Sequence, residues 1–468
     1  MRNHNYKNYL LVVLLVIYAF NWQDRIALGL VMQDIKSELS LSDTQLGLLT
    51  GIAFALFYSV MGIPLARWAD RGNRVALIAL TVALWSLMVA LCSMAESFMQ
   101  MLVIRMAVAV GEAGCMPAAQ SLIPDYFTRA ERPRAVSIYM LGGPLSVVFG
   151  YFGAGWLNQL YGWRITFMLI GLPGLVLAPL AWFTLREPRH EKLASHVAET
   201  ACSSTEALCV DASSPESTAQ WQVQPQPSVK EVCLTLWGNK AFRHLLFAYS
   251  VLCFSGSGIW QWAPAFFVRS HGLQTGEIGT WFAIIWGAVG SFGTYWGGEL
   301  ASRYASNNER LQLRVIAGAV TTFGFIIPFI FLTHNHYLAF AIMGFAAVMF
   351  RAIDGPLFAT LQTLVPPHMR ATAIALVFLF ANLIGMGIGP LMTGMLSDAL
   401  RPWAGNESLR YALMAMFPGY LWGGWHLWRA SQTVTGDVQT TTQTHHNHAP
   451  SGDTVALNST IELTRVLS

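Results

Sequence analysis

Six ionisable side chains interrupt stretches of the sequence that are otherwise long and apolar. An ionised side chain at the centre of a bilayer costs about 2.5–3.5 kcal/mol on insertion scales, so each of them calls for a reason. Carboxylates in such places can take up protons, and arginines can neutralise them or bind anions. The candidate proton-coupling and substrate-binding residues are three acids and three bases: Asp24, Arg25, Arg105, Glu112, Arg351 and Asp354.

The spacing of these residues predicts which of them share a helix face. Arg105 and Glu112 are seven positions apart, nearly two helical turns, so both lie on one face of their helix. The base and the acid near position 350 are three apart and also share a face. Asp24 and Arg25 are neighbours, about 100° apart around the helix axis, so both can line a cavity only near its edge.

Two interpretations of these charges stay open. We expect that protonation of Asp24 or Glu112 frees Arg105 or Arg25 to bind an anionic group of a substrate. Alternatively, the charges form static ion pairs that hold helices together, although buried pairs often contribute little net stability.

The elements that must position these residues are membrane-spanning helices. The chain has 468 residues, of which 54% are hydrophobic and 11% charged, whereas soluble chains carry about 25% charged residues. This composition excludes an ordinary soluble enzyme, and a span needs only about 20 apolar residues. Twelve apolar runs predict twelve helices, at 9–33, 44–66, 75–95, 98–122, 135–158, 165–185, 243–268, 277–300, 312–333, 337–362, 372–397 and 409–430.

Polar segments divide the chain into four parts. Residues 1–186 and 241–430 are each expected to form a six-helix bundle. A largely disordered linker at 187–240 and a disordered tail at 431–468 follow from their polar, aperiodic composition. With a cytoplasmic amino terminus, twenty basic residues fall inside and five outside, so both termini, the linker and the tail are predicted to be cytoplasmic.

The two halves also repeat each other. Gln45-Leu46-Gly47 has a counterpart 232 positions later, and the RAVSI segment at 134–138 resembles RATAI 236 positions later. Nearly equal offsets indicate a duplicated six-helix unit, which is typical of transporters that rock two bundles around a central site.

Several motifs resemble the major facilitator superfamily. They are GIPLARWADRGNR at 62–74, with Ala66 where the signature usually has a glycine, Arg105 followed by GEAG at 111–114, and Gly142-Gly143-Pro144. The resemblance implies two pseudo-symmetric bundles of transmembrane helices. It also implies an inner gate of ion pairs, made when the protein faces outward and broken on inward opening, and a bend in span five. The gate residues are Asp70, Arg71, Arg74 and Asp125, with Asp70 also facing the start of span eleven, and the bend residues are Gly142, Gly143 and Pro144.

A narrower resemblance is to the spinster-like branch of that superfamily. It is carried by residues 21–25, 42–50, 110–114, 262–272 and 382–390 and extends over about 10–430. Members of this branch are proton-linked or facilitative carriers, and its animal members move lysolipids or phosphorylated sphingoid bases. The resemblance therefore implies an anionic amphipathic substrate.

These observations predict a secondary active transporter that works by alternating access with proton coupling. The alternatives are a proton-linked carrier of a small organic acid and a membrane receptor that moves nothing. No phosphate-binding GxxxxGK[ST] loop, HExxH or GxSxG motif occurs, and the six cysteines form no CxxC pair, so no enzyme, cofactor or metal is expected. The net charge of +3 gives no reason for a nucleic-acid partner. We expect a monomer in a bacterial inner membrane.

Overall fold

The computed structural model describes residues 2–128, 131–188, 229–305, 308–365 and 369–448. All regular elements in these ranges are helical, which confirms the predicted all-α fold. The first half of the chain holds α1 (Arg2–Asn21), α2 (Gln23–Leu39), α3 (Asp43–Thr50), α4 (Ile52–Arg71), α5 (Arg74–Cys92), α6 (Phe98–Ala113), α7 (Cys115–Tyr126), α8 (Arg132–Met140) and α9 (Gly142–Thr184).

The second half contains two segments of π-helix. Its elements are α11 (Val229–Gly238), α12 (Lys240–His271), α13 (Thr275–Phe282), the π-helix η1 (Ala283–Val289), α14 (Gly290–Ala305), α15 (Glu309–Leu332), α16 (His336–Arg351), α17 (Asp354–Thr363), α18 (Arg370–Phe380), the π-helix η3 (Ala381–Ile388), α19 (Gly389–Ala404), the 3-10 turn η4 (Gly405–Glu407), α20 (Ser408–Met414) and α21 (Phe417–His448).

The twelve predicted crossings are recovered from these elements. Within the described residues, nine helical stretches are long and apolar enough to span a membrane. Two of them, Arg134–Thr184 and Leu376–Asp437, each contain two crossings. In the first, the turn is made at Gly162, whose φ of +79° suits a residue without a Cβ. The unbroken run from α13 through η1 to α14 supplies the remaining crossing.

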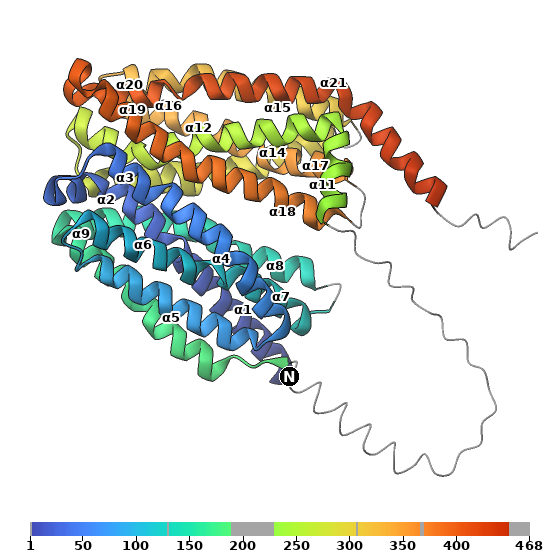
Figure 1. Ribbon diagram of the computed structural model, residues 1–468, viewed down its shortest axis with the longest axis horizontal. Coiled ribbons are helices and arrows are strands. Elements are labelled where there is room, and N and C mark those ends of the chain that lie inside the picture. The colour runs from blue at the N-terminus through green and yellow to red at the C-terminus, as the bar shows by residue number, and fades with distance from the viewer. Residues whose placement is uncertain (1, 129–130, 189–228, 306–307, 366–368, 449–468) are drawn as a thin grey trace, which may run out of the picture.

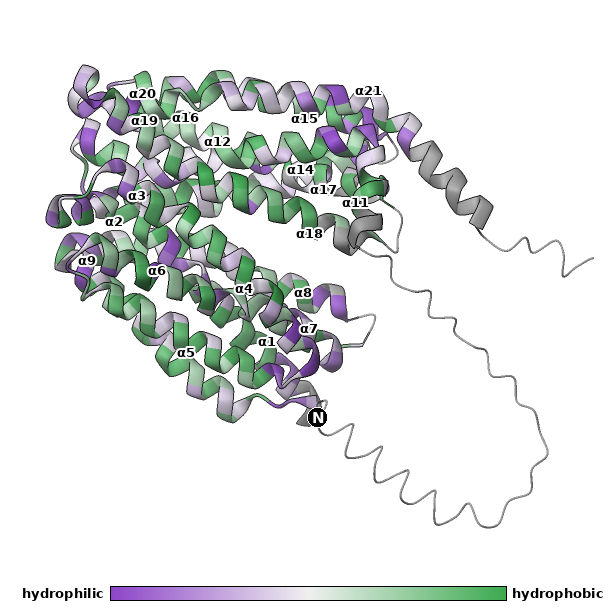
Figure 2. Ribbon diagram, viewed as in Figure 1, coloured by the Kyte–Doolittle hydropathy of each residue, from purple (hydrophilic) through white to green (hydrophobic). Residues whose placement is uncertain are grey.

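The helices form two bundles, one from each half of the chain (Figure 1). The bundles lie against each other at the end that holds the end of α2, the start of α3, and α19, which we call the closed end. They diverge toward the end where α1 begins and where α7, α8 and α11 lie, which we call the open end. Figure 2 shows hydrophobic residues along the middles of the helices and hydrophilic residues gathered at the two ends, as a bilayer requires.

Three helix breaks have a common cause in proline. A proline lacks a backbone N–H, so the carbonyl four positions earlier loses its helical partner. Pro117 lies four positions after the end of α6, Pro144 four after the end of α8, and Pro356 five after the end of α16. The helix α6 ends one residue after Glu112, and α16 ends at Arg351 itself. Proline thus places the buried Glu112 and the half-buried Arg351 at helix ends.

Two predicted boundaries differ from the structure. The last helix continues past position 430 to His448, although residues 431–468 were expected to be a disordered tail. Inside the expected linker, α11 forms a helix over Val229–Gly238. The polar composition after position 430 hides the extension of α21. The helix α11 is short and mostly apolar, and it was missed because it directly follows a long polar segment. The rest of the predicted linker, residues 189–228, and the end of the tail lie outside the described residues.

The closed end is held by close backbone approach between the bundles. A Cβ on Gly51, which directly precedes α4, would collide with the carbonyl oxygen of Gly387. A Cβ on Gly279 of α13 would collide with the carbonyl oxygen of Tyr151. Small residues allow such contacts between helices in a membrane, where apolar burial alone gives helices no reason to associate.

Two carboxylates join the bundles at the same end. Asp398 of α19 accepts hydrogen bonds from the backbone N–H groups of Asp43 (3.1 Å) and Thr44 (2.7 Å), and so caps the start of α3. The Asp43 carboxylate in turn binds Arg269 of α12 with two hydrogen bonds of 2.6 and 2.8 Å and accepts one from Ser397. A paired fork of this kind is stronger than a neutral hydrogen bond.

We predict that Asp398→Ala weakens the closed end. Loss of a capping side chain costs about 1 kcal/mol, and here the cap comes from the opposite bundle, so the cost falls on the contact between bundles. Spin labels at the exposed positions 40 and 274, one on each bundle, should show a population with longer separations in electron-resonance distance measurements. The control is Glu38→Ala, which removes a carboxylate that pairs with Arg164 inside one bundle. Equal distance distributions for the parent and Asp398→Ala would contradict the assignment.

Candidate functional site

Four of the six predicted charges form one cluster inside the first bundle. The Nη1 atom of Arg105 on α6 lies 2.5 Å from Oδ2 of Asp24 on α2. The Nε atom of Arg25 on α2 donates to Oε2 of Glu112 on α6 at 2.9 Å. No member is more than 7% exposed. In one ion pair the acid lies on α2 and the base on α6, and in the other the base lies on α2 and the acid on α6. The cluster is therefore neutral when both acids are ionised.

Local structure explains how adjacent residues reach different partners. Arg105 and Glu112 both face α2, separated by about 10 Å along α6 at 1.5 Å per residue. On α2, the side chains of Asp24 and Arg25 point about 100° apart around the helix axis. Asp24 therefore reaches Arg105, and Arg25 reaches Glu112. The break between α1 and α2 at Trp22 also places Asp24 in the first turn of α2, where unbonded N–H groups favour a negative charge.

Aromatic rings surround the Arg25 guanidinium. Its Cζ atom lies 4.2 Å from the ring centre of Phe54, 4.6 Å from that of Trp22 and 4.8 Å from that of Tyr58. Ring faces attract cations, and the attraction is largest when water is excluded. Arg25 can therefore stay charged even when its carboxylate partner is neutralised.

Three polar atoms of the cluster lack a hydrogen-bond partner within the described part of the chain. They are Oδ1 of Asp24, Oε1 of Glu112 and Nε of Arg105. A buried polar atom without a partner costs about 1–3 kcal/mol, so such atoms are rare and need an explanation. Each acid thus has one oxygen engaged by an arginine and one oxygen available to a proton.

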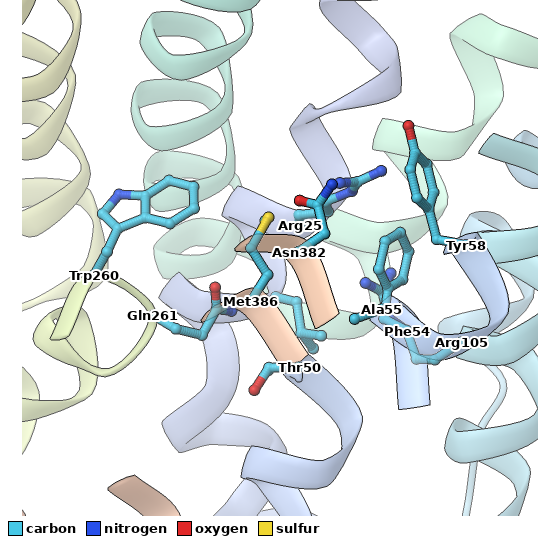
Figure 3. Close-up of a pocket in the computed structure, with 11 residues that line it drawn as sticks. Arg25, Thr50, Phe54, Ala55, Tyr58, Arg105, Trp260, Gln261, Asn382 and Met386 are labelled. Carbon is cyan, nitrogen blue, oxygen red and sulfur yellow. The ribbon is translucent and has the colours of Figure 1, made fainter. Parts of the chain in front are cut away.

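A small cavity of about 30 Å³ lies beside the cluster, between the two bundles (Figure 3). Arg25 and Arg105 line it from the first bundle together with Thr50. Gln261 and Asn382 line it from the second bundle, so amide groups face the arginines across the cavity. Asp24 and Glu112 are not among the lining residues and lie behind the arginines, so a ligand meets the cations first.

A larger cavity of about 460 Å³ adjoins the small one. Trp260 and Met386 line both cavities, so the two share a wall. The larger cavity is lined mostly by apolar and aromatic side chains of the second bundle, including Phe323, Ile327 and Phe350. Space of this kind suits the apolar part of a ligand.

The remaining predicted charges lie apart from the cluster. Arg351, at the end of α16, lines the larger cavity. The Asp354 side chain lies outside the described residues, so its expected pairing with Arg351 stays a prediction. Gly143 and Pro144 line the larger cavity at the break between α8 and α9, and Gly142 packs against Tyr18 of α1.

The predicted inner-gate residues lie at the open end. Arg74 is fully buried and pairs with Asp125 at 2.6 Å. It also binds Glu187, whose carboxylate accepts from the Arg74 backbone N–H (2.8 Å) and from its Nε (3.0 and 3.1 Å). Asp70 and Arg71 are exposed. The start of α18 adjoins residues 366–368, outside the described part, so the expected contact of Asp70 there stays a prediction.

Comparison with known proteins identifies the family. A family model for the Major Facilitator Superfamily matches residues 14–390. The chain belongs to this superfamily. An MFS-type efflux pump of Mycolicibacterium smegmatis is 30% identical over 430 residues, with 91% of this chain and 93% of that protein covered. Protein spinster homolog 1 of Xenopus tropicalis is 25% identical over 449 residues, with 89% and 79% covered.

A solved structure agrees with both the fold and the branch. The crystal structure of a bacterial homolog to the human lysosomal transporter Spinster, in an inward-facing and unoccupied conformation, is 29% identical and superposes with a TM-score of 0.77. The match covers 92% of this chain and 98% of that one. The resemblance to the spinster-like branch and the twelve-helix transporter fold are therefore confirmed, and the chain is a transporter rather than an enzyme.

Sequence reasoning missed several residues of the site. Glu187 was assigned to the linker, because it stands where polar composition begins. Gln261 and Asn382 are ordinary amides with no spacing signal, although Asn382 lies in one of the segments that carry the resemblance to the branch. The aromatic residues around Arg25 could be found only through the fold, since Phe54 and Tyr58 come from α4.

Removing one partner of a buried ion pair should cost more than removing both. Arg25→Gln leaves Glu112 as an uncompensated charge, which we predict to lower the free energy of unfolding by about 3–5 kcal/mol. The double variant Arg25→Gln/Glu112→Gln should recover much of this loss. Thermal unfolding of the purified protein in one detergent measures the effect.

The exposed pair of Arg164 and Glu38 provides the control. Its side chains are 34% and 47% exposed, so Glu38→Gln should cost less than about 1 kcal/mol. If the double variant of the buried pair were as unstable as the sum of its single variants, the two residues would not be coupled and the assignment would fail.

Proposed function

We propose that the protein is a secondary active transporter that works by alternating access and couples protons to the movement of an anionic amphipathic solute. This proposal rests on the observation that two cavities with different linings adjoin each other. A small cavity with two arginines shares Trp260 and Met386 with a much larger, mostly apolar cavity. An amphipathic anion has the matching division into a charged head and an apolar tail.

The head group binds at the arginine-lined cavity. Arg25 and Arg105 each present guanidinium N–H groups, which bind carboxylates and phosphates in a fork geometry. Thr50, Gln261 and Asn382 offer neutral hydrogen-bonding groups to the uncharged part of the head. The tail then lies along the wall that both cavities share and extends into the larger one.

Proton binding is coupled to binding of this anion because the cluster must remain close to neutral. Both arginines are already balanced by Asp24 and Glu112, so an added anion leaves a net negative charge inside apolar surroundings. A proton on the oxygen of either acid that lacks a partner restores the balance and releases one arginine to the substrate. Proton uptake and anion binding are thus favourable together and unfavourable apart.

The direction of opening follows from the distribution of basic residues. We place the open end in the cytoplasm, because the positive-inside rule assigns both termini and the segments between bundles to that side. The described conformation then faces inward, and the closed-end contacts form the outer barrier. The Arg74–Asp125 pair, which was expected to break on inward opening, is intact in this conformation, since both residues belong to the first bundle. A single chain contains both cavities, so we propose a monomer, in a bacterial inner membrane.

A small organic acid is a second candidate for the substrate. The specific observation in its favour is the polar wall of the small cavity, where two arginines face two amides and a threonine hydroxyl. A compact acid would use these groups and leave the larger cavity empty. A carrier of this kind would show no preference for a long apolar chain.

Reconstituted liposomes distinguish these candidates. With an imposed pH gradient, we expect fluorescent lysophosphatidylglycerol to cross the membrane and gluconate to stay. Movement of gluconate alone would favour the small-acid carrier, and binding of either without movement would favour a receptor.

Proton coupling has its own test in Glu112→Gln and Asp24→Asn. Each amide is permanently neutral, so we expect transport that no longer responds to the imposed pH gradient, while exchange of labelled for unlabelled substrate continues. Glu38→Gln, at the closed end, is the matched control and should retain the response. An unchanged pH response in both buried variants would remove the coupling proposal.

A further inference from the structure

Exposed aromatic and basic side chains gather near the open end, where α12 packs against α11 and α21 (Figure 1). The Trp237 ring of α11 lies 6.2 Å from the Phe247 ring of α12. Trp237 is 53% exposed, and Trp425 of α21 is 49% exposed. We call these three side chains and the two arginines beside them the interface patch. It comprises Trp237, Arg243, Phe247, Trp425 and Arg429.

Two histidines fix the helices that carry the patch. The Nδ1 atom of His244 on α12 lies 2.8 Å from Nδ1 of His426 on α21, so one ring donates an N–H and the other accepts it. The His244 ring also contacts the Trp425 ring edge to face, and the His426 ring lies 5.6 Å from that of Phe247. The side chains of the patch are therefore held in a constant arrangement across α12 and α21.

Each arginine of the patch lies beside an indole. The Cζ atom of Arg243 is 6.0 Å from the centre of the Trp237 ring, and that of Arg429 is 5.9 Å from the centre of the Trp425 ring. Within the described part of the chain, neither guanidinium group has a carboxylate within 4.0 Å. Both act electrostatically on the His244 ring, so one anion near that ring is attracted by both.

The positive charge of the patch is not balanced by its neighbours. Positions 240–248 and 421–437 together hold three lysine or arginine residues and one acidic residue. The acid, Asp437, accepts a hydrogen bond of 2.7 Å from a backbone N–H at the start of α12. Arg429 donates to Gln432, a neutral amide, at 3.4 Å. The patch therefore keeps a net positive charge that an external anion can neutralise.

The patch lies at the depth of the lipid headgroups. Ser408 begins α20 at the closed end, where it contacts Ser397, and Arg429 follows it by 21 positions, about 32 Å along the helix axis. The hydrocarbon core of a bilayer is about 30 Å thick. Arg243 is the fourth residue of α12, at the same end of the molecule. Indoles are enriched at this level, where the ring meets acyl chains and the N–H meets polar groups.

We infer that the interface patch binds the headgroup of an anionic phospholipid. The guanidinium groups of Arg243 and Arg429 bind the lipid phosphate with charge-assisted hydrogen bonds. The exposed rings of the patch lie against the upper part of the acyl chains. Because aromatic rings flank both cations, the ligand is a lipid rather than free phosphate. The inference goes beyond the proposed transport and does not depend on it, since the site is separate from the arginine cluster between the bundles.

Native mass spectrometry of the full chain in detergent measures this binding directly. The protein is titrated with dioleoyl phosphatidylglycerol and, in parallel, with dioleoyl phosphatidylcholine. The second lipid has the same acyl chains and a phosphate but no net charge. We expect the first molecule of phosphatidylglycerol to bind at least about fivefold more tightly than the first molecule of phosphatidylcholine, the factor that one basic residue at a membrane surface supplies.

Variants assign that preference to the patch. Arg243→Gln and Arg429→Gln should each lower the affinity for phosphatidylglycerol about fivefold and leave the affinity for phosphatidylcholine unchanged. The matched control is Arg303→Gln, because the Arg303 side chain is 70% exposed and already binds Glu299. The two patch variants lie on different helices, so misfolding of one leaves the other to decide.

The double variant Arg25→Gln/Glu112→Gln separates this site from the proposed substrate site and should keep the full preference for phosphatidylglycerol. Loss of the preference in that variant, with both patch variants unchanged, would place the lipid between the bundles and overturn the inference. Equal affinity for the two lipids, or an equal loss in Arg303→Gln, would overturn it as well. Displacement of phosphatidylglycerol by an equal concentration of inorganic phosphate would show a site for the free anion and contradict the lipid assignment.

Discussion

Two carboxylates and two guanidinium groups neutralise one another in apolar surroundings, and this requirement constrains how α2 and α6 pack within the first bundle. Asp24 binds Arg105 and Arg25 binds Glu112, so each ion pair fixes α2 against α6. Neither pair can separate unless a proton or another ion takes the place of the lost partner, because an isolated charge is too costly there. We therefore propose that this neutral cluster links proton uptake to anion binding by exchanging partners.

The rest of the fold places this cluster where exchange is possible. Prolines end α6 and α16 beside Glu112 and Arg351, so ionisable residues lie at helix ends rather than along unbroken helices. Close glycine contacts and the capping of α3 by Asp398 join the bundles at one end, while they diverge at the other. The arginines consequently lie between a closed barrier and an open end, next to a cavity that both bundles line.

Much of this organisation was predictable from the sequence, and part of it was not. The twelve crossings follow from apolar runs, and the common face of Arg105 and Glu112 follows from their spacing. Which arginine pairs with which acid depends on the rotation of α2 against α6, and no local pattern records that rotation. Glu187 was missed because a polar segment resembles a linker whether or not one of its side chains is buried. The two π-helices have no distinct composition, so their contribution to the cavities required the structure.

The most direct test of the central claim is infrared difference spectroscopy of the protein before and after anionic substrate is added, with aspartate and glutamate isotopically labelled. The account predicts a new protonated-carboxyl band on substrate binding, shifted by the label and lost when Asp24→Asn and Glu112→Gln are combined. Substrate binding and transport without any change in carboxyl protonation would contradict it.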